Sequence, residues 1–263
     1  RASKARLLSQ HELATRLSFL VWASIPDEEL DRRADRGELA DTTSLVAELR
    51  RMLKDGRARS LAEDFAGQWL QTRLIEPHEV DVAKFPAWTP ALARSARREV
   101  EDFFTWMLTA DRPLGELVTS DVGFADATLA QHYGVPAPTD PSGRVALPAN
   151  RKAGVLGKAG LLSLTSYPNR TSVVKRGVWV LTQLLCNAPP PPPPGAEVID
   201  PTRVPAEAPL RRRMEIHREA AECNACHQLI DPIGFGLESF DAIGRHRTMD
   251  GSDPIDDSGE LPD

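Results

Sequence analysis

The chain has 263 residues, which is enough for one large domain or two ordinary ones with a sizeable core. Its formal net charge of −6 and the lack of a basic low-complexity arm exclude the usual features of a nucleic-acid-binding protein. No apolar run reaches the roughly 18 residues that a membrane span needs, so we expect no span in this chain.

Residues 1–140 show helical patterns separated by short breaks, which predicts a helical bundle domain. Ser9 and Glu12 form a capping box at the start of the first helix, and Pro26 ends that apolar pattern. Further stretches with apolar residues at helical spacing occupy residues 42–53, 61–70, 92–108 and 125–133. No combination of nucleophile, base and oxyanion hole can be identified in this half.

A second segment, residues 141–263, is punctuated by glycine and proline and is expected to be irregular but mostly helical. The proline-rich and polar stretch at 135–150 is typical of a connector. Six consecutive prolines at 189–194 predict a polyproline II strut of about 20 Å. This strut leads to a helix expected at 210–222. The fold class is therefore expected to be mainly α.

The strongest chemical signal is the sequence C-x-x-C-H, formed by Cys223, Cys226 and His227, which is the attachment motif of c-type haem. Each cysteine can add to one haem vinyl group, and the following histidine is placed to coordinate the iron. We therefore predict one covalent haem c, with His227 as the proximal iron ligand. A chance match, a zinc site and a free dithiol are the alternatives. No second ligand pair for zinc follows, and the β-α-β context of a thioredoxin-like dithiol is absent.

Several motifs occur along the chain in one order. They are L-A-T-R-L-S-F-L-V-W at 13–22, F-A-G-Q-W-L at 65–70, L-A-Q-H-Y-G at 129–134, R-T-S-V-V-K-R-G at 170–177, C-N-A-C-H at 223–227 and D-P-I-G-F-G-L-E-S-F-D at 231–241. In these motifs the chain resembles the planctomycete-type cytochrome c proteins, secreted multi-domain haem-binding proteins catalogued as domains of unknown function. The resemblance implies a mostly helical fold and a haem protein located in the periplasm or outside the cell. It implies no defined reaction.

Haem is attached to this motif outside the cytoplasm in bacteria, so we expect a leader segment upstream of Arg1 or removed from it. A backbone carbonyl around Pro232 is expected to accept the second imidazole N–H of His227, and Phe235 to supply an apolar wall of the haem site. Three cations are candidates to pair with the haem propionates, with an exposed helix start as the alternative interpretation: Arg170, Lys175 and Arg176. The third cysteine, Cys186, is expected to be a buried apolar thiol, with a disulfide to another chain or a remote iron ligand as alternatives.

The distal iron ligand must carry a nitrogen or sulfur that haem iron accepts. The candidates in the sequence are His217, His132, His246, Met214 and Met249. We rank His217 first, because it lies ten residues before His227 and can fold over the haem if the helix breaks before Cys223. His132 ranks second, and a five-coordinate iron is the alternative to both.

Two classes of function follow from these features. We favour an electron-transfer module that passes single electrons to a redox partner protein or a neighbouring domain, because no distal Arg–His pair for peroxide cleavage can be identified. The second class is a haem enzyme, peroxidase-like or oxidative, with an open iron position. A structural subunit stapled by the haem is a third, weaker alternative. In each case the chain is a candidate subunit of a larger assembly.

Overall fold

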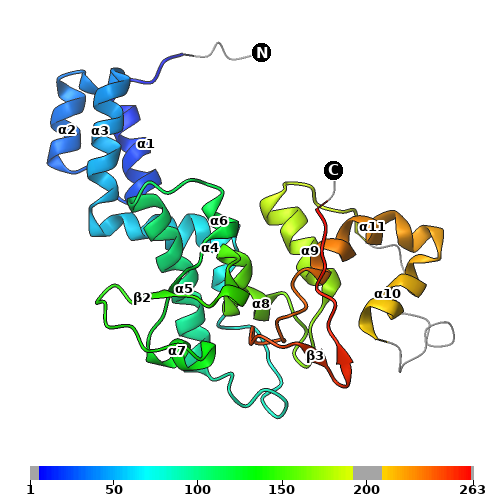
Figure 1. Cartoon of the computed structure of the whole chain (residues 1–263). Helices are drawn as coiled ribbons and strands as arrows, with labels where there is room; N and C mark the ends of the chain where they lie inside the picture. Colours follow the sequence, from blue (N-terminus) through cyan, green and yellow to red (C-terminus); the bar gives the residue numbers. More distant parts are fainter. Residues whose placement is uncertain (1–5, 192–208, 262–263) are drawn as a thin grey trace. The chain divides into compact units, whose positions relative to one another are not determined.

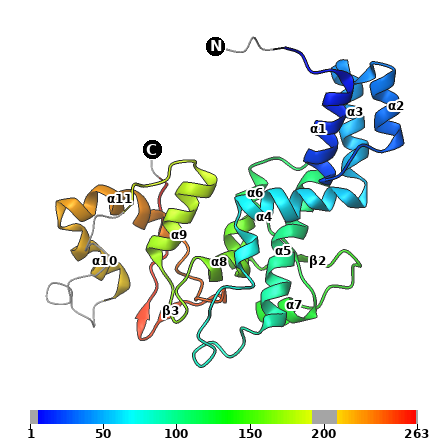
Figure 2. The same cartoon turned by 180° about the vertical axis from the view of Figure 1, so that it is seen from behind.

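A computed structural model describes residues 6–191 and 209–261 of the chain. The described parts are mainly helical, with two short antiparallel sheets (Figure 1, Figure 2). This confirms the prediction of a mainly α fold. Residues 192–194 of the predicted polyproline strut lie outside the described residues. No helix in the described ranges has both the length and the apolar composition of a membrane span.

The chain divides into two compact units, and each is described by itself. Unit 1 contains Arg1–Arg73 and Glu101–Leu117, and unit 2 contains Leu74–Val100 and Val118–Asp263. The long helix α5 (Pro90–Thr109) contributes residues to both units. The expected domain boundary between residues 140 and 141 stays a prediction.

Unit 1 is built from short helices, in which α denotes an α-helix and η a 3-10 or π-helix (Figure 1). Its elements in chain order are α1 (Gln10–Trp22), α2 (Glu28–Asp35), η1 (Glu38–Ala40), α3 (Thr42–Leu53), η2 (Gly56–Ala58), η3 (Leu61–Ala66) and α4 (Gly67–Trp69), followed by the end of α5. Two further short helices, η4 (Thr72–Leu74) and α6 (Glu116–Thr119), contain the residues where the division falls.

Side-chain caps fix the starts of the first three α-helices of unit 1. The Ser9 hydroxyl accepts from Glu12 N at 3.2 Å and the Glu12 carboxylate accepts from Ser9 N at 2.8 Å, which confirms the predicted capping box. Asp27 caps α2 and Asp41 caps α3 in the same manner. The three helices enclose an apolar core whose fully buried members include Ala14, Leu30, Leu39 and Met52.

Unit 2 carries the cysteine motif and combines helices with two strand pairs. After the first part of α5, its elements are β1 (Val122–Phe124), α7 (Ala127–Tyr133), β2 (Arg144–Ala146), η5 (Ala149–Arg151), η6 (Gly154–Gly157), α8 (Ala159–Leu164), α9 (Val173–Trp179), η7 (Val180–Leu184), α10 (Leu210–Arg218), α11 (Ala221–Phe235), β3 (Met249–Asp250) and β4 (Asp253–Pro254). β1 pairs with β2 in register Val122 to Ala146, and β3 pairs with β4. The expected connector at 135–150 thus contains a paired strand.

A buried polar cluster holds four elements of unit 2 together. The Tyr133 hydroxyl on α7 donates to the Glu99 carboxylate on α5 at 2.5 Å and accepts from Ala159 N at 2.9 Å. The Lys158 ammonium lies 3.4 Å from the same carboxylate and donates to Val122 O at 2.7 Å. Burial raises the pKa of Glu99, and the nearby Lys158 opposes that rise. The interior of this unit therefore contains a buried pair of ionisable side chains, Glu99 and Lys158.

Candidate functional site

The predicted attachment motif lies on the N-terminal half of α11. Cys226 and His227 lie three and four residues after Cys223, so the three side chains share one side of the helix. All three side chains are half-buried, and both thiols are free. The chain leaves helical geometry between the end of α10 at Arg218 and the start of α11 at Ala221. The helix break on which the ranking of His217 depended is therefore present.

His227 is held by a buried carboxylate one turn further along the same helix. Its Nδ1 lies 2.8 Å from Oδ1 of Asp231, and Asp231 is 0% exposed. The sequence predicted a backbone carbonyl in this role, whereas the structure places a carboxylate there. The spacing of four residues between His227 and Asp231 is the signal that sequence reasoning missed, since such pairs face each other on a helix.

Two imidazoles meet at the junction of α10 and α11. The rings of His217 and His227 contact edge to face, with centroids 4.8 Å apart and planes at 83°. The structure therefore brings the first-ranked distal ligand next to the proximal one. An iron ligated by both rings would have to separate them, because two metal–nitrogen bonds of about 2 Å each would then lie between their nitrogens.

α11 is positioned by an unusually close crossing with α9, which lies beside it in both views (Figure 1, Figure 2). A Cβ at Gly177 would come within 2.1 Å of Ile230 O, and a Cβ at Gly234 would come within 2.0 Å of Val173 O. Only glycine allows the two backbones to approach so closely. The helix that carries the motif is therefore fixed to α9 by backbone contact.

The three expected propionate partners differ in their surroundings. Arg176 is 1% exposed and donates to the carbonyls of Leu237, Phe240 and Asp241 at 2.6 to 2.9 Å. Burial lowers the pKa of Arg176 to about 10. The Glu238 carboxylate, 3.1 Å away, opposes this lowering. Arg176 thus connects α9 to the segment after α11.

Arg170 and Lys175 lie closer to solvent, and both contact the ring of Tyr167. The Arg170 guanidinium lies 4.2 Å and the Lys175 ammonium 4.5 Å from the Tyr167 ring centre. Lys175 also donates to Ser166 O at 2.9 Å, and its pKa is lowered by burial. Propionate pairing by Arg170, Lys175 and Arg176 stays a prediction.

The remaining candidates for the distal ligand have other surroundings. His132 is 9% exposed, and its Nε2 lies 2.8 Å from Ile243 O. Burial lowers the pKa of His132 to about 4. Met214 is buried in a small core with Val173 and Phe235, whereas His246 and Met249 are exposed.

Pro232 lies inside α11, where its carbonyl accepts from Glu260 N at 3.3 Å. Phe235 is 2% exposed, and the Arg211 guanidinium covers its ring at 4.1 Å. Cys186 is exposed, so the expectation that this thiol is buried is wrong. Its backbone has a left-handed conformation, with φ of 52°, two residues after the end of η7.

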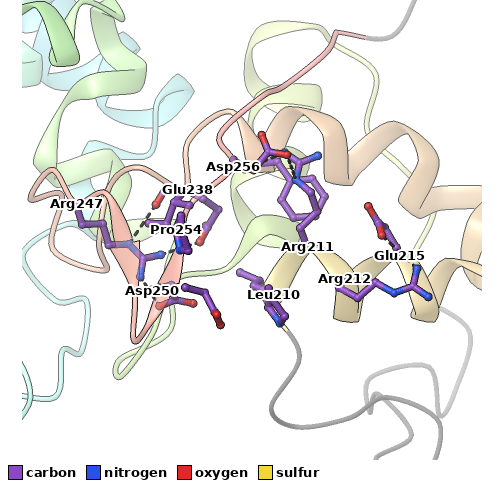
Figure 3. A pocket seen from close by; sticks show the side chains of 13 residues that line it. Leu210, Arg211, Arg212, Glu215, Glu238, Arg247, Asp250, Pro254 and Asp256 are labelled. Carbon is purple, nitrogen blue, oxygen red and sulfur yellow. Dashed lines mark hydrogen bonds and ion pairs between the residues drawn. The ribbon is translucent and has the colours of Figure 1, made fainter.

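A cavity of about 260 Å³ lies among α10, the end of α11 and the β3–β4 hairpin (Figure 3). Its arginines are engaged: Arg211 donates to the carbonyls of Asp256 and Ser258, and Arg247 pairs with Glu238 and Asp250. The volume falls below the range of about 300 to 1,000 Å³ typical of ligand pockets. This charged cavity therefore provides no separate binding site that we can assign.

The side chains around His227 fit a c-type haem. Two free, half-buried thiols lie at the required spacing, and Nδ1 of His227 is engaged, which leaves Nε2 as the nitrogen for an iron. In the described residues, no group of three or more His, Cys, Asp or Glu side chains is arranged to hold a metal ion by itself. The donor set thus suits a metal that brings a macrocycle better than a bare zinc ion.

Two family models match separate parts of the chain. Residues 8–135 match the family model PSD4, described as a protein of unknown function (DUF1592). Residues 152–250 match the family model PSCyt3, described as a protein of unknown function (DUF1588). The segment that matches DUF1588 contains α9 and α11 with the whole C-x-x-C-H motif, and the segment that matches DUF1592 contains His132.

Neither description states a cofactor or a reaction. No curated protein and no solved structure matches the chain. The two matches agree with the resemblance to the planctomycete-type cytochrome c proteins.

Proposed function

We propose that the chain is a c-type cytochrome module of the periplasm or the cell exterior, which carries one covalent haem and transfers single electrons. The observation that carries this proposal is the C-x-x-C-H motif on α11, whose histidine is held by Asp231 at 2.8 Å. The electron partner is a redox protein or a neighbouring domain, and the chain works as one subunit of a larger assembly.

Each residue of the motif has a defined task in this proposal. Cys223 and Cys226 hold the haem through thioether bonds, and His227 directs its Nε2 to the iron. Asp231 holds the imidazole in one orientation through Nδ1. When bound, the haem supplies a one-electron couple at its iron. The contact between α9 and α11 fixes the helix that carries all four side chains.

The position of His217 supports electron transfer over catalysis. Its ring contacts that of His227, so a second imidazole lies close to the first, although the two rings would have to separate to hold one iron. With both imidazoles as ligands, the haem would supply one-electron exchange without a position open to a substrate. Expression with the haem attachment machinery should therefore give a low-spin spectrum.

A haem enzyme with an open iron position is the second candidate, and the His227–Asp231 pair favours it. A carboxylate partner raises the basicity of a ligating imidazole, which donates electron density to the iron. His227 and Asp231 would thus be the residues that adapt a bound haem to the bond-cleaving chemistry it supplies in haem enzymes. A high-spin spectrum of the purified protein would favour this candidate over the first.

Covalent attachment is the decisive test of the proposal. The chain is expressed with a secretion leader and the haem attachment machinery, and then extracted with acidic acetone. We expect the haem to stay on the polypeptide, with the pyridine haemochrome spectrum of two thioether bonds. The variant Cys223→Ala/Cys226→Ala should lose the haem on extraction. Extractable haem in the native chain, or zinc in its place, would overturn the proposal.

A further inference from the structure

The hydrogen bonds of Asp231 do not offset the free-energy cost of burying its carboxylate. The residue is 0% exposed, and its Oδ2 has no hydrogen-bond partner within the described residues. The nearest cation, Arg218 Nε, lies 3.8 Å from that oxygen and is beyond hydrogen-bond distance. A buried carboxylate is costly unless it is fully hydrogen-bonded, so a residue retained there needs another reason.

The position of α11 does not provide that reason. The helix is held against α9 at Gly177 and Gly234, and the buried side chains of Ile230 and Ile233 add apolar contact. A neutral side chain of similar size at residue 231 would be compatible with the same packing. The strongest contact made by the Asp231 carboxylate is the one at 2.8 Å to Nδ1 of His227. The carboxylate of Asp231 therefore acts chiefly on the imidazole of His227.

We propose that Asp231 is a positioning residue that fixes the Nδ1–H tautomer of His227, strengthens its Nε2 as an electron donor and so gives the haem iron a low reduction potential. This inference rests on the proposed function. An N–H group that donates to a carboxylate leaves more electron density on the rest of the imidazole. A more basic axial ligand stabilises ferric over ferrous iron.

Arg218 moderates this effect from the other side of the carboxylate. Its Nε is 3.8 Å from Oδ2, near enough for charge attraction but too far to share a proton. Removal of Arg218 leaves the carboxylate more strongly negative and His227 more strongly polarised. We therefore expect loss of Asp231 and loss of Arg218 to shift the potential in opposite directions.

The main test is the midpoint potential of the haem-loaded protein, measured by optical redox titration. Asp231→Asn should raise the potential by an amount equal to at least a tenfold change in the reduction equilibrium, about 59 mV for one electron. Asp250→Asn removes the same charge from a half-exposed side chain of the β3–β4 hairpin. This control should change the midpoint potential by less than a third of the shift expected for Asp231→Asn. An unchanged or lowered potential in Asp231→Asn would overturn the inference.

A second variant keeps the inference testable if Asp231→Asn does not fold. Arg218→Gln retains the carboxylate and should lower the potential more than Arg212→Gln, an arginine on α10 that pairs with Glu215 instead. Equal shifts of the midpoint potential in Arg218→Gln and Arg212→Gln would mean that Arg218 does not act through Asp231.

Failure of the proposed function is recognised separately. If the purified chain holds no haem, the proposed function fails, and ¹⁵N NMR of the His227 ring still tests the pair. We then expect a proton on Nδ1 in the native chain and on Nε2 in Asp231→Asn. A native chain with the proton on Nε2 would overturn the positioning role whether or not haem is bound.

Discussion

The carbonyl oxygen of Ile230 lies so close to the Cα of Gly177 that a Cβ at residue 177 would meet it at 2.1 Å. Gly234 has the same relation to Val173 O, at 2.0 Å. Both contacts belong to the crossing of α9 and α11. Because a backbone oxygen cannot move aside as a side-chain end can, the crossing depends on two residues that lack a Cβ.

Gly177→Ala should therefore lower the free energy of unfolding of unit 2 by about 3 kcal/mol or more, the upper end of overpacking costs. Urea unfolding followed by circular dichroism measures the change. The matched control is Gly56→Ala, since nothing lies within 4 Å of a Cβ at Gly56. An equal, small effect in both variants would show that the two helices can separate without cost.

Arg176 makes the second connection between α9 and the segment that follows α11. Arg176→Met leaves three carbonyl groups and the buried Glu238 without this donor, so we expect a loss of about 3 to 5 kcal/mol. The exposed Arg94 is the matched control, and Arg94→Met should change the unfolding free energy by less than about 0.5 kcal/mol. A stable Arg176→Met protein would show that these carbonyls find other partners.

The sequence was sufficient to predict features that depend on neighbours along the chain. The Ser9–Glu12 capping box is local, because it is decided by residues within one turn. The helix expected at 210–222 is wrong in its end, since α10 ends at Arg218 and α11 begins at Ala221. Within α11, the spacing of the cysteines and His227 places them on one side, but that helix was not predicted.

The features that the sequence did not reveal depend on residues far apart in the chain. Arg176 was expected near propionates, but its acceptors lie more than 60 residues away, at Leu237 and Phe240. The strand at 144–146 was interpreted as connector because three residues are too few for an alternating pattern, and its partner β1 is equally short. Such pairings are fixed by tertiary packing and leave no periodic signal.

His132 should make the stability of unit 2 depend on pH. Burial lowers its pKa from 6.5 to about 4, so the native state keeps it neutral where the unfolded chain already binds a proton. The unfolding free energy is not reduced by His132 above pH 6.5, and it falls through protonation of His132 in the unfolded chain as the pH drops from 6.5 toward 4. Between pH 7 and pH 5 this one group should cost about 2 kcal/mol of unfolding free energy.

The comparison of His132→Gln with the native chain separates the contribution of His132 to the pH dependence of stability from that of other titrating groups. A glutamine amide can still donate to Ile243 O but does not titrate. Urea unfolding at pH 7 and pH 5 should show a smaller pH-dependent loss in the variant, by about 2 kcal/mol. An identical loss in both proteins would mean that His132 is not neutral in the native state.

The last prediction concerns the distal iron ligand. His217 contacts His227 at 4.8 Å between ring centres, next to the break between α10 and α11. If His217 binds iron, His217→Ala should convert a low-spin haem spectrum to a high-spin one, because one axial position then lacks a protein nitrogen. His246→Ala, at an exposed imidazole after α11, should leave the spectrum unchanged. A low-spin spectrum retained in His217→Ala would exclude His217, and a high-spin native protein would favour the haem enzyme.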